Sequence, residues 1–575
     1  TQTDLVFIGG GHNGLVGAWY LARHGLKVTV LERRHVVGGA AVTEEFHPGF
    51  RNSTASYTVS LLNPKVIADM ELARHGLRIV ERRASNFLPL NDREYLLTGE
   101  GRTYDEVAKF SRKDADLLGA YADRLEAIAE ILRDLVLETP PNMVEGGLLA
   151  ALPELIKAGG VGRRLGRLNT PERRDLLDLF TKSAGDWLDG WFESDPIKAC
   201  YGFDSIVGNY ASPYAAGSAY VLLHHVFGEV NGKKGAWGHA IGGMGAITQA
   251  MAAACAEAGV TIRLDSPVQE VLTDGGRAVG IVTDTGERIS ARTVVANVHP
   301  RLLYERLMDP AVLPEDFRER IGRYASGSGT FRMNVALSEL PRFSCLPEAG
   351  DHLTAGIIMA PNLKYMDEAW MDARRHGWSQ KPIIEMLIPS TLDDSLAPAG
   401  QHVASLFCQH VEPGLDWDKH RQTVAELMIS TIDGYAPGFK ASVIGYEANS
   451  PLDLERKFGL VGGDIFHGKL SLDQLFSARP VLGHGNYRAP VAGLYMCGAG
   501  THPGGGVTGA PGHNAAREIL RDLERYVAWN GRVPGLCSGH DQLRGDRPEA
   551  RPDDALPRVR QGQAVPILSQ GRSGL

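Results

Sequence analysis

Apolar runs, glycine-rich turns and helix-like spacing follow one another in order over the first 32 residues. Residues 4–9, DLVFIG, form an apolar run of strand length, the turn GGGHNG follows, and LVGAWYLARHG has the spacing of a helix. A second apolar run from Lys27 to Leu31 then leads to Glu32. This order predicts strand, glycine turn, helix and second strand, as in α/β folds.

The rest of the chain mixes helical and strand patterns. Residues 246–258 and 417–435 are predicted to be helices, and residues 113–137 place leucine, alanine and isoleucine on one helical face. A further helix is predicted to begin at TPERRDLLDLF, with Thr170 as N-cap and Pro171 at the first position. Short strands are predicted at VTIRL, PVQEVLT, AVGIVTD, TVVANV, TFRMNVALS, PIIEMLIP and VAGLYMC.

The first glycine turn has the spacing of a dinucleotide site. Gly9, Gly11 and Gly14 match G-x-G-x-x-G directly after a predicted strand. The first glycine permits the tight turn, the second lets the backbone approach a pyrophosphate, and the third lets the helix pack on the strand. Glu32 ends the second strand, where its carboxylate can accept hydrogen bonds from ribose hydroxyls. These residues predict a bound dinucleotide but do not choose between NAD and FAD.

The next segment resembles the FAD-dependent amine oxidase and phytoene desaturase superfamily. Glu32 is followed by RRHVVGGAAVT, which is similar to the second dinucleotide motif of that superfamily, usually Gly-Gly-Arg and then Ser or Thr. Here Ala40 replaces the arginine and Thr43 stays. The resemblance therefore implies cofactor contacts by Gly38, Gly39 and Thr43 and no arginine contact.

The glycine-rich stretch GAGTHPGGGVTGAPGHNAA lies between the predicted strand VAGLYMC and the last predicted helix. A helix N-terminus offers unpaired N–H groups and partial positive charge, which suit phosphate oxygens or the pyrimidine edge of a reduced flavin. The stretch resembles the C-terminal FAD signature of bacterial phytoene desaturases, carotenoid isomerases and retinol saturases. Within that superfamily the chain is most similar to the pyridine nucleotide-disulfide oxidoreductase domain-containing protein 2 group. The resemblance implies FAD contacts by Gly500, Thr501, Val507, Thr508 and Gly509, and packing of Val268 by the adenine.

The expected fold class is α/β. It combines a Rossmann-like FAD-binding domain of the amine oxidase and phytoene desaturase type with an inserted, mixed α+β substrate-binding lobe. The FAD-binding domain is assigned to residues 1–103, 231–300 and 491–530, the helical part of the substrate lobe to 104–230, its second part to 301–490, and a disordered tail, with no role in cofactor binding, to 531–575.

Charge and hydropathy exclude two classes of partner. A formal net charge of −8, without a dense Lys/Arg run, gives no electrostatic footprint for nucleic acid. No apolar run approaches the roughly 18 residues of a spanning helix, and the apolar start shows no basic leader. We expect a cytoplasmic protein, and leave a peripheral membrane contact or a mitochondrial location open.

The cysteine pattern restricts the redox chemistry. The six cysteines include no C-x-x-C pair and no interleaved histidines, so neither a redox dithiol nor a metal site is predicted, and the thiols are expected to be reduced and mostly buried. No second nicotinamide-binding fingerprint is predicted. Electrons leaving a non-covalently bound FAD would therefore pass to oxygen or a quinone, unless the reaction is a redox-neutral isomerisation.

Few side chains qualify as catalytic candidates, because in many flavoenzymes the cofactor takes the hydride and the protein positions the substrate. His502, inside the C-terminal glycine stretch, is the first candidate for a residue near the flavin ring. His239 and Arg332 are weaker candidates, and both are expected to be structural. His12, inside the first glycine turn, is expected to lie at the solvent edge.

The middle of the chain bears on the substrate. Trp187, Trp191 and Phe192 are predicted to cluster, either in the core or on the wall of a lipophilic tunnel or a membrane-facing lip. The apolar content of the two lobe segments would suit a hydrophobic substrate.

Three functional hypotheses follow. The leading one is an FAD-dependent oxidoreductase that desaturates, saturates or isomerises carbon–carbon bonds of a lipophilic, polyene or isoprenoid, substrate. The second is a flavin-dependent amine oxidase acting on C–N bonds, which a compact aromatic cage would favour. The third is a flavin-binding regulatory or interaction protein without turnover.

Overall fold

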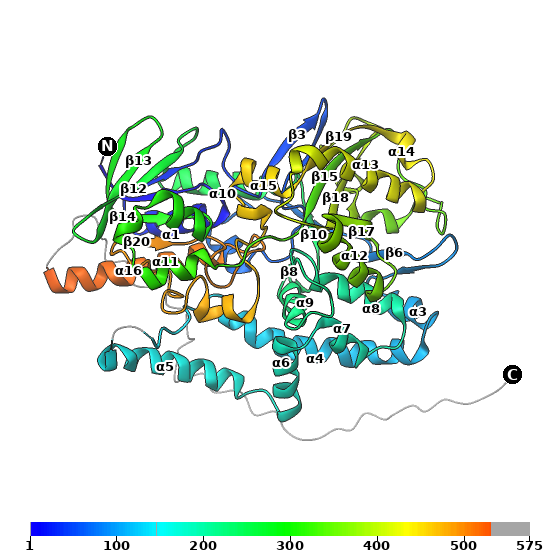
Figure 1. Ribbon diagram of the computed structural model, residues 1–575, viewed down its shortest axis with the longest axis horizontal. Helices are drawn as coiled ribbons and strands as arrows, with labels where there is room; N and C mark the ends of the chain where they lie inside the picture. The colour runs from blue at the N-terminus through cyan, green and yellow to red at the C-terminus, as the bar shows by residue number, and fades with distance from the viewer. Residues whose placement is uncertain (1, 145–146, 531–575) are drawn as a thin grey trace, which may run out of the picture. The chain divides into compact units, whose positions relative to one another are not determined.

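Two mixed β-sheets organise the computed structural model, which describes residues 2–144 and 147–530 (Figure 1). The first sheet combines strands from both ends of the described chain with strands between residues 261 and 296, and the second combines strands between residues 86 and 97 with strands between residues 331 and 449. The predicted disorder of residues 531–575 lies outside the described residues.

The first sheet has the order β11-β2-β1-β14-β13-β12, with β20 also paired to β14. Strands β11, β2, β1, β14 and β20 run parallel, and β12 and β13 add an antiparallel edge. Four consecutive buried residues in β2 agree with a strand covered on both faces. The bounds are β1 Gln2–Ile8, β2 Val28–Leu31, β11 Thr261–Arg263, β12 Val268–Asp274, β13 Arg277–Thr283, β14 Arg288–Ala296 and β20 Leu494–Met496.

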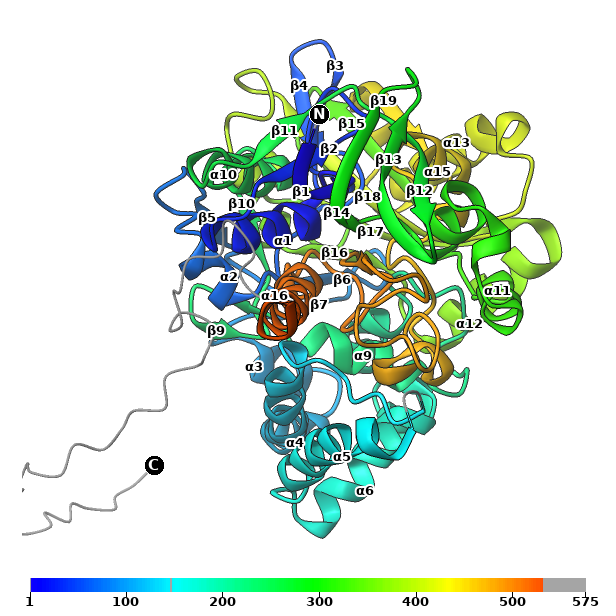
Figure 2. The same cartoon turned by 90° about the vertical axis from the view of Figure 1, so that its left-hand side faces the viewer.

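Three helices from distant parts of the chain cover one face of this sheet. Helix α1 (His12–Arg23) packs against both α10 (Met244–Glu257) and α16 (Ala510–Asn530), so the two ends of the described chain lie side by side (Figure 2). On the other face, α11 (Glu315–Gly322) contributes Phe317 to a core that includes Ile281. The predicted Rossmann-like arrangement is thus confirmed.

The second sheet has the order β19-β15-β18-β17-β16-β6-β7 and forms the frame of the lobe. Helix α13 (Trp417–Tyr435), which has the bounds predicted from sequence, buries Trp417 and Met428 against it. Helix α12 (Leu363–His376) packs against β17. The strand bounds are β6 Asn86–Pro89, β7 Tyr95–Leu97, β15 Phe331–Leu337, β16 Gly356–Met359, β17 Trp378–Leu387, β18 His402–Val411 and β19 Val443–Asn449.

A helical segment lies beside the second sheet, at the bottom of Figures 1 and 2. Trp187 and Phe192 are buried in the core of this segment, and Trp191 packs against it. The core interpretation of this aromatic cluster is therefore confirmed. The helices are α3 Thr103–Ala108, α4 Arg112–Val136, α5 Gly147–Leu165, α6 Thr170–Thr181, α7 Ala184–Asp189, α8 Asp195–Gly202 and α9 Ser218–Val226.

Two details differ from the sequence prediction. Strands β6 and β7 fall within residues 1–103, which were assigned to the cofactor domain, but β6 pairs with β16 and β7 pairs with β6 at the edge of the lobe sheet. The N-cap of α6 is Asn169 and not Thr170, because the Asn169 side chain accepts from the backbone of Glu172 in a reciprocal capping box. The remaining bounds are β3 Thr43–His47, β4 Phe50–Ser53, β5 Ile79–Glu81, β8 Glu229–Val230, β9 Lys233–Lys234, β10 Gly238–Ala240, α2 Pro64–Asp69, α14 Phe439–Ser442 and α15 Pro451–Phe458.

Candidate functional site

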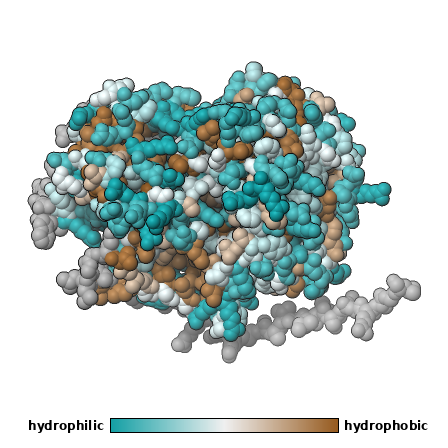
Figure 3. Space-filling model, in the orientation of Figure 1, coloured by the Kyte–Doolittle hydropathy of each residue, from teal (hydrophilic) through white to brown (hydrophobic). Residues whose placement is uncertain are grey.

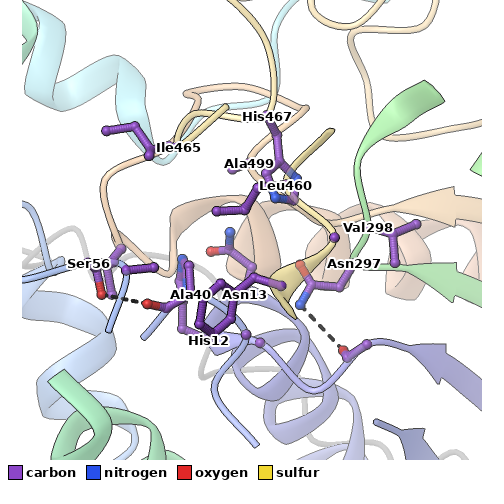
Figure 4. Close-up of a pocket in the computed structure, with 18 of the residues that line it drawn as sticks. His12, Asn13, Ala40, Ser56, Asn297, Val298, Leu460, Ile465, His467 and Ala499 are labelled. Atoms are coloured by element: carbon purple, nitrogen blue, oxygen red, sulfur yellow. Dashed lines mark hydrogen bonds between the residues drawn. The ribbon is translucent and has the colours of Figure 1, made fainter. Parts of the chain in front are cut away.

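A large cavity is lined by residues that both sheets and their connections contribute. The β1–α1 turn, the end of β2, the segment 55–61 and residues 505–507 of the C-terminal glycine stretch all reach it. Figure 4 shows His12, Asn13 and Asn297 on one side of this space, with His467 and Ala499 across from them.

The β1–α1 turn places a helix N-terminus at the cavity. Gly9 has a φ of 97°, and a Cβ added to Gly14 would lie 2.5 Å from the Gly9 carbonyl oxygen, so the turn closes only with glycine at both positions. Gly11 is the N-cap of α1 and makes no side-chain capping bond. The Asn297 side-chain oxygen can accept from the N–H groups of Gly11 and Gly14. The other N–H groups of this first turn and the positive end of the helix dipole are available to an anionic group such as a pyrophosphate.

Glu32 is fixed at the end of β2 by the turn beside it. Its Oε2 accepts from the backbone N–H of Gly10 at 2.8 Å, and its Oε1 accepts from that of Arg34 at 3.0 Å. The carboxylate lines the cavity and keeps lone pairs for a further donor. This geometry fits the role that the sequence predicts, a contact with ribose hydroxyls.

The second dinucleotide motif, Gly38 to Thr43, mainly supports the β1–α1 turn, and only part of it lines the cavity. Gly39 lines the cavity, whereas Gly38 bridges to Gly11 and its N–H donates to the Gly10 carbonyl at 2.9 Å. Thr43 lies behind the lining, where its Oγ1 accepts from the backbone N–H of Gly245 at the start of α10.

In the C-terminal glycine stretch too, some residues line the cavity and others support the lining. Val507, with a φ of 59°, lines the cavity. Thr508 caps α16, because its Oγ1 accepts from the Ala510 N–H at 3.1 Å, and Thr501 bonds to the Gly498 carbonyl. Of the predicted cofactor residues, those that line the cavity are Gly9, Gly11, Glu32, Gly39, Val268 and Val507, and those that support the lining are Gly14, Gly38, Thr43, Gly500, Thr501, Thr508 and Gly509.

Buried polar atoms around the cavity lack partners among the described residues. Asn13 is 2 % exposed, and its Oδ1 has no partner. Buried polar groups are almost always hydrogen bonded, so such atoms mark the place of a polar ligand. The same holds for the side chains of His12, Arg34, Ser60 and His467 that line the cavity, each of which carries at least one buried nitrogen or oxygen without a partner. With the glycine turn and Glu32, these atoms fit FAD.

Three histidines, His12, His225 and His467, line the cavity, and burial lowers the pKa of each, that of His225 to about 4. Burial lowers the pKa of His12 to about 4, and burial together with the nearby Arg479 guanidinium lowers the pKa of His467 to about 3. His12 was expected at the solvent edge, but the close packing of the turn buries both of its ring nitrogens. Neutral imidazoles can donate or accept one hydrogen bond each toward a bound ligand.

Arg479 shapes the wall that carries His467. It is fully buried and donates to the carbonyl oxygens of Phe466 at 2.7 Å and of Ala499 at 2.8 Å, both cavity-lining residues. Further bonds reach the carbonyls of Gly468, Lys469 and Gln474. The guanidinium thus joins two loops that are distant in sequence.

Two of the predicted catalytic candidates, His502 and His239, are not among the residues that line the cavity. The Nε2 of His502 lies 2.9 Å from the Leu135 carbonyl oxygen on α4, and His502 is not among the residues that line the cavity. This position gives no support to a catalytic role. His239 pairs with the buried Asp393 at 2.9 Å and is structural, as expected.

The lobe contributes an apolar end to the cavity. Val207, Trp237, Phe407 and Ile465 line it, together with the ring of Tyr57. The Tyr57 hydroxyl donates to Glu385 at 2.6 Å. Arg332 holds this region by donating to the Ala55 carbonyl and, on β18, to Leu406 and Ser405.

Sequence reasoning missed several of these residues. Asn13 lies inside the recognised glycine motif and could have been found there. Tyr57, Glu385, His467 and Arg479 lie in no local motif, since only the folded lobe brings them to the cavity.

Comparisons with known proteins agree with the site. The pattern of the family described as flavin containing amine oxidoreductase matches residues 14–331. The chain is 42% identical over 553 residues to the pyridine nucleotide-disulfide oxidoreductase domain-containing protein 2 of Rattus norvegicus, covering 91% of this chain and 94% of that relative. It is 25% identical to the zeta-carotene-forming phytoene desaturase of Myxococcus xanthus, covering 91% and 94%.

A solved structure shares the fold. An oxidoreductase from Methanosarcina mazei aligns with a TM-score of 0.56 at 15% identity and covers 91% of this chain and 100% of that one. Within residues 2–144 and 147–530, no helix has the length and apolar character needed to cross a membrane. The described cysteines, Cys200, Cys255, Cys345, Cys408 and Cys497, are free thiols.

Proposed function

Because the chain belongs to the flavin containing amine oxidoreductase family and is an FAD-dependent oxidoreductase, we propose that it desaturates, saturates or isomerises a carbon–carbon bond of a lipophilic substrate. The observation that carries the proposal is the change of lining along the cavity. Unpartnered polar atoms surround its cofactor part, and Val207, Trp237, Phe407 and Ile465 line the part built by the lobe. A ligand of this second part would bury apolar surface and meet few polar groups.

The residues of the chain have distinct tasks in this reaction. FAD, when bound, accepts or returns the hydride. The N-terminus of α1 binds its pyrophosphate, and Glu32 accepts from its ribose hydroxyls. The apolar wall orients the carbon–carbon bond and excludes water from the reacting atoms.

The amine oxidase alternative rests on the family description and on the aromatic residues of the cavity. The charges near Tyr57 disfavour it. The Arg332 guanidinium carbon lies 4.6 Å from the centroid of the Tyr57 ring, and Arg82 donates to Thr58 at 2.7 Å. The acidic groups beside these two guanidinium groups are Glu385 and Asp204, and burial raises the pKa of both carboxyls. The remaining positive charge repels a substrate that carries an ammonium group.

An apolar surface patch supports a lipophilic substrate, and we propose that it contacts a membrane. Leu152 is 62% exposed and Ile156 is 70% exposed on α5, and Leu482 is exposed on the loop that bonds to Asn142 through Gly483. Apolar side chains gather over this region, at the lower left of Figure 3. The last turn of α5 carries Arg163 and Arg164. Arg164 pairs with Glu138 at 3.0 Å, and the charge of Arg163 complements anionic lipid headgroups.

The function is tested by anaerobic mixing of the holoenzyme with two sets of compounds. We expect terpenoid or carotenoid compounds in detergent micelles to bleach the flavin absorbance, or to reoxidise the photoreduced enzyme, with a changed carbon–carbon bond in the recovered product. Benzylamine and alkyl diamines should leave the spectrum unchanged. Bleaching by the amines alone would replace the proposal by amine oxidation, and a flavin that none of the compounds changes would indicate a protein without turnover.

The membrane contact has its own test. The protein should sediment with vesicles that contain phosphatidylglycerol, and the double substitution Leu152→Ser and Ile156→Ser should reduce the bound fraction about tenfold. Absence of sedimentation with these vesicles would contradict the proposed contact and leave the proposed reaction untouched.

A further inference from the structure

Tyr57 is held in one orientation at the apolar part of the cavity. Its ring stacks on Phe407, with centroids 5.2 Å apart and an interplanar angle of 25°. Arg332 lies 4.6 Å from the ring centroid. Arg332 is itself 1% exposed and is fixed by three hydrogen bonds. The phenol therefore cannot turn away without breaking a stack and a cation–π contact.

The Tyr57 hydroxyl already donates its proton in a hydrogen bond. It donates to Oε2 of Glu385 at 2.6 Å, and Glu385 is 6% exposed and does not line the cavity. A phenol oxygen that donates its proton keeps lone pairs that accept hydrogen bonds. The carboxylate behind it polarises the O–H bond, which makes that oxygen a stronger acceptor.

Two other polar side chains of this wall, His225 and Thr58, are already hydrogen bonded. Nδ1 of His225 lies 2.8 Å from the Val221 carbonyl oxygen. Thr58 donates to the Gly238 carbonyl and accepts from Arg82. Tyr57 thus presents an acceptor among side chains whose remaining surface toward the cavity is mainly apolar.

We propose that Tyr57 is the specificity-determining contact for a substrate with an apolar skeleton and one neutral hydrogen-bond donor, an alcohol, with Glu385 as its positioning residue. The inference rests on the proposed function, because it concerns the lipophilic ligand of the same cavity. A neutral donor is selected over an ammonium group because Arg332 and Arg82 flank the Tyr57–Glu385 pair. An ether or hydrocarbon of the same skeleton would leave the Tyr57 oxygen buried without a donor.

The test compares three probes with one skeleton: farnesol, farnesyl methyl ether and farnesylamine. Each is titrated into the holoenzyme, and binding is followed by the change in the visible flavin spectrum. We expect farnesol to bind about tenfold more tightly than the ether, which corresponds to about 1.4 kcal/mol, and farnesylamine to bind no better than the ether. In the Tyr57→Phe variant, the affinity for farnesol should fall to the affinity for the ether. The affinity for the ether should stay within about twofold of its value in the native protein.

The chain offers a matched control. Tyr210 also donates to a carboxylate, Glu412 at 2.9 Å, but it is not among the residues that line the cavity. Tyr210→Phe should keep the tenfold preference for farnesol, and Glu385→Gln, which can still accept from Tyr57, should keep part of it. A purely structural role of Glu385 would change stability without changing the ratio of the two affinities.

The outcomes separate this inference from the proposed function. Equal binding of farnesol and its ether by the native protein, or an unchanged preference in Tyr57→Phe, overturns the role of Tyr57 and leaves a lipophilic ligand supported. Preferential binding of farnesylamine overturns the role and favours the amine alternative. Failure of all three probes to bind contradicts the lipophilic ligand itself, and with it both proposals.

Discussion

The two parts of the cavity use their polar atoms in opposite ways. In the cofactor part, both ring nitrogens of His12 and the Oδ1 of Asn13 are buried without a partner among the described residues. In the lobe part, Tyr57 and Glu385 bond to each other, and Arg332 is saturated by the backbone and Ser405. The first part is complementary to a polar ligand that completes its hydrogen bonds. The second is complete by itself, so it selects by apolar shape and by one remaining acceptor.

The largest effect is expected from a substitution at Gly14, where the β1–α1 turn leaves no room for a side chain. In Gly14→Ala the new Cβ would lie 2.5 Å from the Gly9 carbonyl oxygen, so the turn must shift away from the position that receives the pyrophosphate. The ratio of flavin to protein absorbance after purification should fall at least about tenfold. Gly119→Ala is the control, because Gly119 lies within α4 and a Cβ there meets nothing within 4 Å. Normal flavin content in Gly14→Ala would show that the turn is not the cofactor site.

Removing one member of the lobe network formed by Tyr57, Glu385 and Arg332 should lower the free energy of unfolding and leave the flavin content unchanged. Glu385→Leu leaves the Tyr57 hydroxyl without an acceptor and the buried Arg332 without its nearby carboxylate. The free energy of unfolding, measured in urea, should fall by about 3–5 kcal/mol. Glu412→Leu, at the partly exposed Tyr210 pair, should cost about 1 kcal/mol or less. If Glu385→Leu lost its flavin while keeping its stability, the two parts of the cavity would not be independent.

The cofactor part could be predicted from sequence because its chemistry is local. Gly9, Gly11 and Gly14 lie within six residues, and Glu32 follows at the end of the next strand, so spacing alone places them together. The helices and strands around them follow from apolar periodicity, and α13 has the predicted bounds.

The lobe part could not be predicted, because its contacts are long-range. Tyr57 and Glu385 are 328 residues apart and meet only when β17 enters the second sheet beside the segment that follows β4. The pairing of β6 with β16, which draws part of residues 1–103 into the lobe sheet, was not predicted for the same reason, since strand pairing depends on partners far along the chain. His502 was singled out by its place in the glycine stretch, but the folded loop brings its ring to Leu135.

A carboxyl beside the network of Tyr57, Glu385 and Arg332 should make the free energy of unfolding depend on pH. Burial and the nearby Glu385 raise the pKa of Asp204 to about 8. In the unfolded chain this pKa is about 3.9, so between pH 4 and 8 the folded state holds a proton that the unfolded state has lost. Stability is therefore lost as the pH rises through this range. Asp204→Asn should be about 2 kcal/mol more stable than the native protein at pH 8 and equal to it near pH 4. A constant difference across both pH values would contradict the shifted titration.

The smallest effects distinguish two histidines that have similar chemistry and different positions. His467 lines the cavity, and its Nδ1 has no partner among the described residues, whereas the Nε2 of His502 is engaged with the Leu135 carbonyl. Burial lowers the pKa of both, to about 3 and about 4, so both are neutral at pH 7. The difference between them is then contact with the ligand and not charge.

Substitution of each histidine by glutamine should therefore give different spectra. His467→Gln should shift the visible bands of the bound flavin, because it changes a polar group at the cavity wall. His502→Gln should leave the bands unchanged and lower the free energy of unfolding by about 1 kcal/mol, the worth of one hydrogen bond. The measurement is the absorption spectrum of each holoenzyme together with its urea midpoint. A shifted spectrum in His502→Gln alone would contradict this assignment and would indicate that His502 contacts the flavin ring. The cavity would then extend beyond the wall formed by Phe466 and Ala499, whose carbonyls Arg479 binds.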